Sequence, residues 1–266
     1  MPESKQNTSL CIVCDSDTLY EQARSFAAEQ QLPLFNKKDN SFELQLIFGS
    51  ERIELFDKQL NTSIFVDFVS GALAHRQQFG GGRGQAIAKA IGLKQGKTPS
   101  VLDVTAGLAR DAYILATLGC RMTLVEKSPV LSVLIQDGIN RGLESEQSAQ
   151  TLSEDFELHN QNAINFMKNL DKHLLPEIIY IDPMYPERKK SALVKKDMQI
   201  LQRLLEKEEK DGELLEAALN CARERVVVKR PVHAPCLTTT KPATSIHSKK
   251  TRYDIYLTTS SKNQSK

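Results

Sequence analysis

The strongest constraint on the fold is a regular alternation of short apolar runs and helical patterns between residues 101 and 257. Strands separated by helices form βαβ units, which assemble into a mainly parallel sheet. In such sheets, ligands bind beyond the carboxyl ends of the strands. We therefore predict an α/β fold with its site at that edge. Strands are expected at 101–104, 122–125, 156–159, 178–181, 226–229 and 253–257, and helices at 85–91, 111–118, 130–140, 163–170, 197–207 and 213–223.

The region before this alternation has a different texture. Short β-type runs at 10–13, 42–48, 52–55 and 64–68 surround one helical pattern at 18–30. We interpret this region as a small α/β N-terminal subdomain. The predicted division is an N-terminal subdomain at 1–68, a main domain at 69–259 and a flexible tail at 260–266.

Composition excludes several classes of protein. The polar start lacks the apolar stretch of a secretory signal, and no apolar run approaches the ~20 residues of a membrane span. Five widely spread cysteines favour reduced thiols, and Cys11 and Cys14 lack the second ligand pair that a zinc site needs. We expect a soluble, cytoplasmic protein without a metal.

The first strand of the main domain ends in a loop of small residues. Thr105, Ala106, Gly107 and Ala109 let the backbone approach a ligand at the following helix N-terminus. The loop is not G-x-G-x-x-G, and charged Arg110 and Asp111 follow it. These side chains suit the methionine end of S-adenosylmethionine, with Arg110 pairing with its carboxylate and Asp111 with its ammonium. The alternative is that both residues only cap the helix.

An acidic residue ends the second strand about twenty residues beyond this loop. Glu126 stands at the position in this kind of fold where a carboxylate accepts hydrogen bonds from the two hydroxyl groups of a ribose. An acid after a strand is just as often a helix cap, so Glu126 alone does not specify a nucleoside. The loop and Glu126 together predict an adenosine-type ligand.

The fourth strand ends in the run Ile181-Asp-Pro-Met-Tyr-Pro186. Methylation of an exocyclic amine needs acceptors at the N–H hydrogens, which the Asp182 carboxylate and the Pro183 carbonyl supply. Tyr185 offers a face on which a flipped-out base can stack. An ordinary Asp-Pro turn is the alternative, but D-P-x-[aromatic] at this point of the fold favours catalysis.

Basic side chains follow this motif directly. A cationic segment beside a base pocket is typical of a phosphate clamp, although a solvated helix face is the alternative. The segment contains Arg188, Lys189, Lys190, Lys195 and Lys196. A second basic set contains Lys229, Arg230, Lys241, Lys249, Lys250 and Arg252.

Several blocks of the sequence resemble the bacterial small-subunit ribosomal RNA (guanine-N2)-methyltransferases, the RsmJ family. The resemblance runs from about residue 64 to 257, and departs from the family at Ala109 and Cys236. The blocks are 65–68, 74–76, 79–84, 103–111, 182–186, 189–196, 226–231 and 252–256.

The resemblance implies a class I, Rossmann-like S-adenosylmethionine-dependent methyltransferase fold. It also implies transfer of one methyl group to guanine N2 in 16S ribosomal RNA of the small subunit, leaving S-adenosyl-L-homocysteine. Cofactor contacts carried over by motif fall on Arg110, Asp111, Glu126, Lys127, Gln161, Asn162 and Asp182.

Other interpretations remain at this stage. A nicotinamide-dependent oxidoreductase shares the sheet and the ribose acid, but it gives no role to the residues at 182–185. A non-catalytic RNA-binding protein on a methyltransferase fold has no need of an intact cofactor loop. The D-P-x-[aromatic] motif also serves methylation of adenine N6 and cytosine N4, in DNA as well as in RNA. His75, Arg76, Phe79 and Arg83 form either an arm over cofactor or RNA, or a linker.

Overall fold

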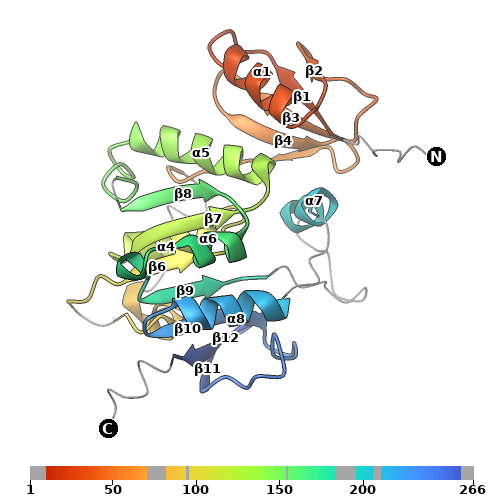
Figure 1. Cartoon of the computed structure of the whole chain (residues 1–266). Helices are drawn as coiled ribbons and strands as arrows, with labels where there is room; N and C mark the ends of the chain where they lie inside the picture. Colours follow the sequence, from red (N-terminus) through yellow and green to blue (C-terminus); the bar gives the residue numbers. More distant parts are fainter. Residues whose placement is uncertain are drawn as a thin grey trace.

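The computed structural model describes residues 10–70, 82–93, 96–153, 155–183, 196–205 and 211–258. These residues form two sheets, with the smaller one built by the N-terminal part of the chain (Figure 1). The smaller sheet has the order β2-β1-β3-β4-β5, and α1 lies over it. Its elements are β1 (Leu10–Cys14), α1 (Tyr20–Glu29), β2 (Leu34–Phe35), β3 (Leu44–Phe48), β4 (Ile53–Asp57) and β5 (Thr62–Ile64).

The larger sheet has seven strands in the order β11-β12-β10-β9-β6-β7-β8. Its helices include α3 (Ala86–Ala90), α4 (Arg110–Thr117), α5 (Pro129–Leu143), α6 (Ala163–Asn169), α7 (Lys196–Leu204) and α8 (Asp211–Cys221), with short 3-10 turns η1 (Gly82–Gly84) and η2 (Lys172–Leu174). Its strands are β6 (Ser100–Asp103), β7 (Arg121–Glu126), β8 (Phe156–Asn160), β9 (Ile178–Ile181), β10 (Arg225–Pro231), β11 (Thr244–His247) and β12 (Thr251–Leu257).

The direction and order of the strands in the larger sheet indicate where a ligand site is expected. Strands β6 to β10 are mutually parallel, whereas β12 runs antiparallel to both β10 and β11. After β6 the chain builds outward through β7 and β8, then returns to place β9 on the other side of β6. The order therefore reverses between β6 and β9, and the crevice beyond their carboxyl ends is the expected binding place.

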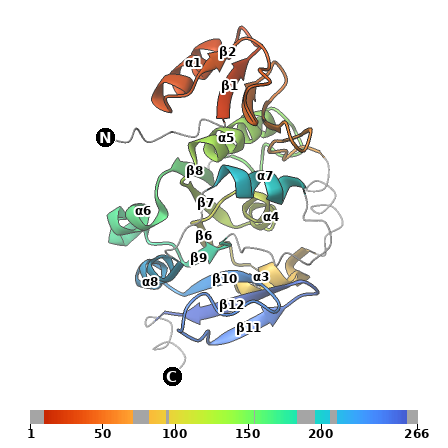
Figure 2. The ribbon, with the colours of Figure 1, turned by 90° about the vertical axis from the view of Figure 1, so that its right-hand side faces the viewer.

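Side chains of the central strands alternate between two cores. Val101, Tyr180 and Val227 belong to the core on one face, which also takes in residues of α3, α4 and α5. Leu102 and Ile179 face the other core, which α6 and α8 cover. Figure 2 shows α6 and α8 on the side of the sheet opposite α3 and α4. Helices on both faces explain why these strands read as continuous apolar runs in the sequence.

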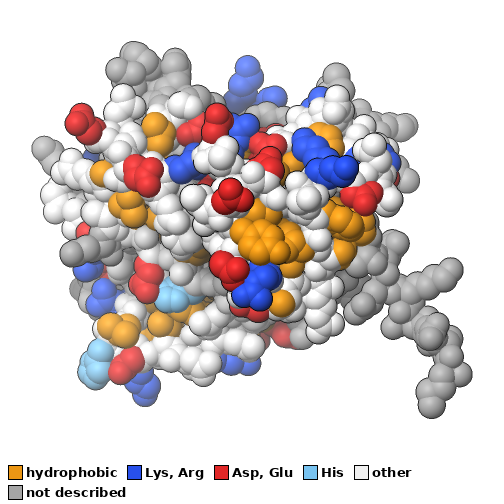
Figure 3. Space-filling view, turned by 90° about the horizontal axis from the view of Figure 1, so that it is seen from above, with side chains coloured by type: hydrophobic (Ala, Val, Ile, Leu, Met, Phe, Trp, Pro, Cys, Tyr) orange, Lys and Arg blue, Asp and Glu red, His pale blue; other side chains and the backbone are white. Residues whose placement is uncertain are grey.

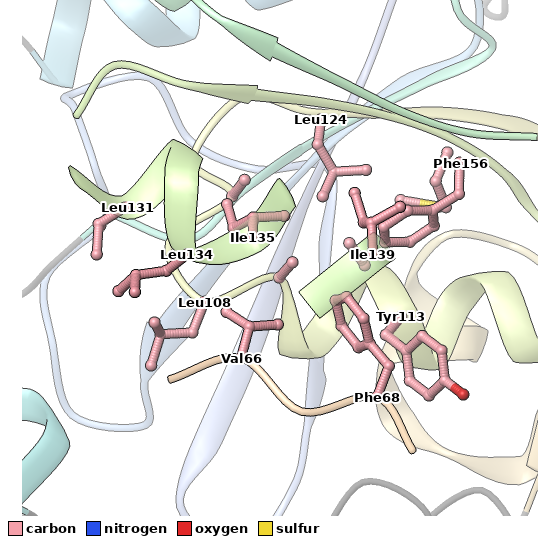
Figure 4. Packing of buried hydrophobic residues seen from close by; sticks show 14 of the residues in the cluster. Val66, Phe68, Leu108, Tyr113, Leu124, Leu131, Leu134, Ile135, Ile139 and Phe156 are labelled. Carbon is pink, nitrogen blue, oxygen red and sulfur yellow. The ribbon is translucent and has the colours of Figure 1, made fainter. Parts of the chain in front are cut away.

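The segment predicted as a strand at 64–68 is different in the structure. Only Ile64 belongs to a strand, and Val66 and Phe68 pack against α5 and α4 instead. Val66 and Phe68 are buried, and the Phe68 ring stacks on Tyr113 with centroids 4.6 Å apart (Figure 4). The period-two burial arises from packing against helices rather than from pairing in a sheet, so the strand prediction was wrong at these residues.

The two sheets share one core. Residues of the N-terminal sheet and of α4 and α5 belong to the same hydrophobic cluster, which Val66 and Phe68 connect. A Cβ atom added at Gly138 of α5 would lie 2.5 Å from Val66 Cγ1, so glycine is needed for this close approach. No helix among the described residues is long and apolar enough to cross a membrane.

Candidate active site

The buried carboxylate of Asp103, at the end of β6, organises the loop that follows. Its Oδ1 accepts hydrogen bonds from the backbone N–H of Thr105 at 3.0 Å and from the Thr105 hydroxyl at 3.3 Å. The same hydroxyl oxygen accepts the backbone N–H of Asp182 at 2.7 Å. This chain of contacts joins the ends of β6 and β9 at the reversal point of the sheet.

Burial raises the pKa of Asp103 to about 7, and the charges of Asp111 and Asp182 act in the same direction. The hydrogen bonds from Thr105 act against that rise in pKa. The raised pKa of Asp103 reflects its burial and the closeness of the carboxyl groups of Asp111 and Asp182 beneath the loop. No role was predicted for Asp103 from the sequence.

The loop after β6 is tightly bent. Gly107 has a φ of +59° and Ala109, which precedes α4, has a φ of +54°. The left-handed conformation favours glycine, so Ala109 holds a backbone conformation that residues with a side chain rarely adopt. The bend directs the backbone N–H of Gly107 to Glu126 Oε2 at 2.8 Å.

Glu126 lies at the end of β7 and is 8 % exposed. Besides Gly107, the backbone N–H of Ser128 donates to its Oε1 at 2.8 Å. The carboxylate thus connects the loop after β6 to the start of α5. The acid supports the start of α5, and it stands where β7 reaches the carboxyl edge of the sheet.

Gln161 and Asn162 lie beside Glu126 at the end of the neighbouring strand β8. The backbone N–H of Gln161 donates to the carbonyl of Glu126 at 3.1 Å, and Asn160 Nδ2 donates to the same carbonyl at 2.7 Å. Asn162 caps α6 by accepting the backbone N–H of Asn165 at 3.1 Å. Lys127 is exposed at the same edge. The structure brings these predicted cofactor residues together.

Asp111 and Asp182 meet at Lys229, a residue of the second basic set. Lys229 Nζ of β10 lies 2.7 Å from Asp111 Oδ2 and 2.8 Å from Asp182 Oδ2. The Tyr180 hydroxyl donates to the same Asp111 oxygen at 2.7 Å. Lys229 is therefore a site residue that the sequence argument missed. Its position at the carboxyl end of β10 was the available signal.

Arg110 is engaged by α7. Its Nη2 atom lies 2.6 Å from Asp197 Oδ2, and both side chains are partly exposed. If Arg110 pairs with the carboxylate of a ligand, as expected, that carboxylate replaces Asp197 as its partner. Pro183 is half-buried beside Asp182. Lys196, the first residue of α7, donates to the Leu60 carbonyl at 3.3 Å.

Several predicted residues lie outside the part of the chain that the structure describes. These are Tyr185, Arg188, Lys189, Lys190 and Lys195, together with His75, Arg76 and Phe79. Arg83 is described, and its Nη2 donates to the carbonyl of Leu118, near the end of α4, at 3.3 Å. That contact is at the amino edge of the sheet, opposite the edge at which Asp182 lies.

Cys11 and Cys14 are both buried in β1 and belong to different cores, on opposite faces of the small sheet. Burial raises the pKa of the Cys11 thiol to about 11, and the charge of Asp39 adds to that rise. Neutral thiols on opposite faces suit the interior of a strand. They do not present a common ligand pair.

A family model of S-adenosylmethionine-dependent methyltransferases matches residues 27–258. A curated relative from Nitrosococcus oceani, named ribosomal RNA small subunit methyltransferase J, is 46 % identical over 249 residues, which cover 93 % of this chain and 98 % of the relative. A relative of the same name from Aeromonas salmonicida is 44 % identical over 248 residues, covering 92 % and 96 %.

The chain belongs to the ribosomal RNA small subunit methyltransferase J family. A crystal structure of an S-adenosylmethionine-dependent methyltransferase from Neisseria gonorrhoeae is 32 % identical, with a TM-score of 0.73, and covers 93 % of this chain and 96 % of its own. The predicted fold class, a Rossmann-like class I methyltransferase with an α/β N-terminal part, is confirmed. Family membership makes the protein a methyltransferase that uses S-adenosylmethionine, so the oxidoreductase interpretation is excluded.

Proposed function

We propose that this methyltransferase transfers the methyl group of S-adenosylmethionine to the exocyclic N2 amine of a guanine in 16S ribosomal RNA of the small subunit. The observation that carries the proposal is the Asp182 carboxylate at the carboxyl end of β9, where the sheet order reverses, beside the loop after β6. Two relatives over 40 % identical carry names that state a ribosomal RNA substrate.

The cofactor loop fits an adenosine-type sulfonium ligand. The loop bends through left-handed conformations at Gly107 and Ala109, and Glu126, Gln161 and Asn162 stand at the neighbouring strand ends. In this proposal Glu126 binds the ribose hydroxyls, and Lys127, Gln161 and Asn162 lie along the adenine. Arg110 and Asp111 bind the carboxylate and ammonium of the methionine end. When bound, S-adenosylmethionine supplies an electrophilic methyl group, and S-adenosylhomocysteine is the product.

Asp182 acts on the target amine. The lone pair of a guanine N2 amine is delocalised into the ring, so attack requires acceptors that draw its N–H hydrogens and localise the pair on nitrogen. The Asp182 carboxylate and the Pro183 carbonyl are those acceptors in the proposed arrangement. Tyr185 supplies the stacking face for the base.

RNA phosphates are proposed to contact Arg188, Lys189, Lys190, Lys195 and Lys196, which follow Asp182 in the chain. A further described surface supports an RNA partner. Pro231 pairs with Thr251, so the turn between β11 and β12 lies at the same edge of the sheet as Asp182. Lys249 and Lys250 are exposed in that turn.

The scarcity of acidic residues around this turn favours the binding of a polyanion such as RNA. Between residues 225 and 258 the single acid is Asp254, which is fully buried and paired with Arg252. By contrast, the view from above in Figure 3 shows Lys and Arg interspersed with Asp and Glu. We name Lys249 and Lys250 the hairpin lysines and place them in the RNA-binding surface.

We also propose the division of the chain into an N-terminal subdomain at 1–68, a methyltransferase domain at 69–259 and a C-terminal tail at 260–266.

The proposal is tested with methyl-labelled S-adenosylmethionine and small subunits from cells that lack the gene. The expected result is label in N2-methylguanosine after digestion of the RNA. Label in N6-methyladenosine, or in DNA offered in parallel, would replace guanine N2 with another amine. Binding of subunits and S-adenosylhomocysteine without transfer would favour a non-catalytic RNA-binding protein.

A further inference from the structure

One ammonium group lies between two carboxylates that belong to different halves of the active site. Asp111 lies in the first turn of α4 on the cofactor side, Asp182 follows β9 on the catalytic side, and Lys229 reaches both from β10. The two N–O distances, 2.7 and 2.8 Å, are those of charge-assisted hydrogen bonds. Lys229 therefore couples the two halves directly.

The environment of Lys229 argues against a phosphate contact. Its side chain is 27 % exposed, and its ammonium already has two carboxylate partners. Burial acts to lower the pKa of Lys229, but the charges of Asp182 and Asp111 outweigh it and raise that pKa. The ammonium is thus protonated throughout the ordinary pH range, so it acts through its charge and cannot accept a proton.

Several neighbours of Asp182 act on its pKa in opposite directions. Burial raises its pKa, Lys229 lowers it, and the like charge of Asp111 raises it again, so the resulting pKa lies above that of an ordinary aspartate. Without the lysine, two carboxylates would face each other in a half-buried site. Among the described residues, the other titratable or charged groups around this cluster are Asp103 of β6, Tyr180 of β9, Arg230 of β10 and Tyr253 of β12.

We propose that Lys229 is a positioning residue for methyl transfer, whose ammonium keeps the Asp182 carboxylate ionised and fixes it relative to the cofactor loop through Asp111. The catalytic meaning of this inference rests on the proposed function. As the N–CH₃ bond forms and the C–S bond breaks, the electron pair of the C–S bond goes to sulfur. The amine nitrogen becomes cationic. An ionised Asp182 holds one N–H hydrogen and accepts that proton, which then passes to water.

The direct test is a ¹³C NMR titration of protein labelled at the aspartate carboxyls, with the Asp182 resonance assigned from Asp182→Asn. Lys229→Met should raise the pKa of Asp182 by about 1–3 units, the effect of losing an adjacent opposite charge. Lys229→Arg keeps the charge and should give less than half of that shift. Both variants are compared with the wild type at saturating S-adenosylhomocysteine.

Rates give a second readout. In single-turnover methylation of small subunits, the acidic limb of the pH–rate profile should move to higher pH in Lys229→Met and stay near the wild-type position in Lys229→Arg. Asp103→Asn distinguishes the source of this limb, because the limb should persist when Asp103 no longer titrates. A uniform loss of rate at every pH, with an unchanged Asp182 titration, would overturn the proposal and leave Lys229 a purely structural role.

Lys229→Met leaves two carboxylates without their cation, so folding is checked by circular dichroism. If Lys229→Met does not fold, Asp111→Asn makes the complementary test, because removing a like charge should lower the pKa of Asp182. An unchanged pKa there overturns the inference. A shifted Asp182 titration in a protein that methylates no subunit contradicts the proposed function, while the effect of Lys229 on Asp182 is supported.

Discussion

Arg203 of α7 and Asp57 of β4 form an ion pair that ties the N-terminal sheet to the edge of the active site. Arg203 Nη1 lies 2.6 Å from Asp57 Oδ2, and the Asp57 side chain is fully buried. Helix α7 lies between the two sheets at the side toward which β9 points (Figures 1 and 2). Since Asp197 of the same helix binds Arg110, the N-terminal sheet supports the cofactor loop through α7.

Arg203→Ala is expected to destabilise the protein by about 2 kcal/mol. It leaves a buried carboxylate without its cation, although partial exposure of Arg203 keeps the effect below that of a fully buried pair. The measurement is urea unfolding at constant pH. Arg24→Ala is the matched control, because its ion pair with Glu21 is exposed and screened by solvent, so its loss should change the unfolding free energy much less. Equal effects of the two substitutions would contradict the anchoring role of Arg203.

Glu126→Gln should weaken binding of S-adenosylhomocysteine. Loss of charge-assisted hydrogen bonds removes about 1.5–3 kcal/mol, or roughly 10- to 150-fold in affinity. Isothermal titration calorimetry measures the change. Glu157→Gln on the neighbouring strand is the control, since that side chain is 63 % exposed and should leave affinity unaltered. Wild-type affinity in Glu126→Gln would remove this residue from the cofactor site.

Much of this site follows from where strands end. Asp182, Glu126 and Gln161 were placed correctly at one edge because each follows an apolar run, and carboxyl ends of parallel strands converge. The site role of Lys229 was missed because a lysine next to an arginine looks like one more member of a basic surface set. Only the register of β10 against β9, and the direction of α4, bring it between two carboxylates.

Other errors have related causes. β11 was not predicted because Thr244–His247 is a polar, half-exposed edge strand with no apolar alternation. The strand expected through Phe68 was wrong because helix packing produced the same alternation. In both cases, partners distant in the sequence decide the structure. Tyr185 and the basic residues from Arg188 to Lys195 stay predictions.

Stability should depend on pH through Asp103. Its pKa is near 7 in the folded protein and close to 4 when unfolded, so the folded state binds the proton more tightly. The contribution of Asp103 to stability is therefore fully present below about pH 4 and is lost as pH rises to about 7. Asp103→Asn cannot titrate but keeps an oxygen acceptor for Thr105.

The difference in unfolding free energy between Asp103→Asn and the wild type should therefore grow from pH 4 to pH 7, by a few kcal/mol at most. Urea titrations of both proteins across this range measure it. Subtracting the two curves removes groups that titrate in both proteins. Parallel curves across the whole range would show that Asp103 does not titrate there.

The hairpin lysines should contribute to RNA affinity without affecting the cofactor. Lys249→Ala combined with Lys250→Ala is expected to reduce the magnitude of the salt slope of RNA binding by about 1.4–1.8, as for two lost phosphate contacts. The double variant Lys168→Ala and Lys172→Ala is the control, because these exposed lysines lie at or beyond the end of α6, toward the amino edge. The hairpin assignment fails if both double variants retain the wild-type salt slope.

The central claim is that Asp182 acts on the base amine, and Asp182→Ala tests it most directly. Single-turnover transfer from labelled S-adenosylmethionine to guanine N2 of small subunits is compared between variant and wild type, with subunit binding measured alongside. We predict at least a ~100-fold loss of N2-methylguanosine formation, as expected for a group that handles the proton, with subunit binding retained. Transfer within a few-fold of the wild type would contradict the account.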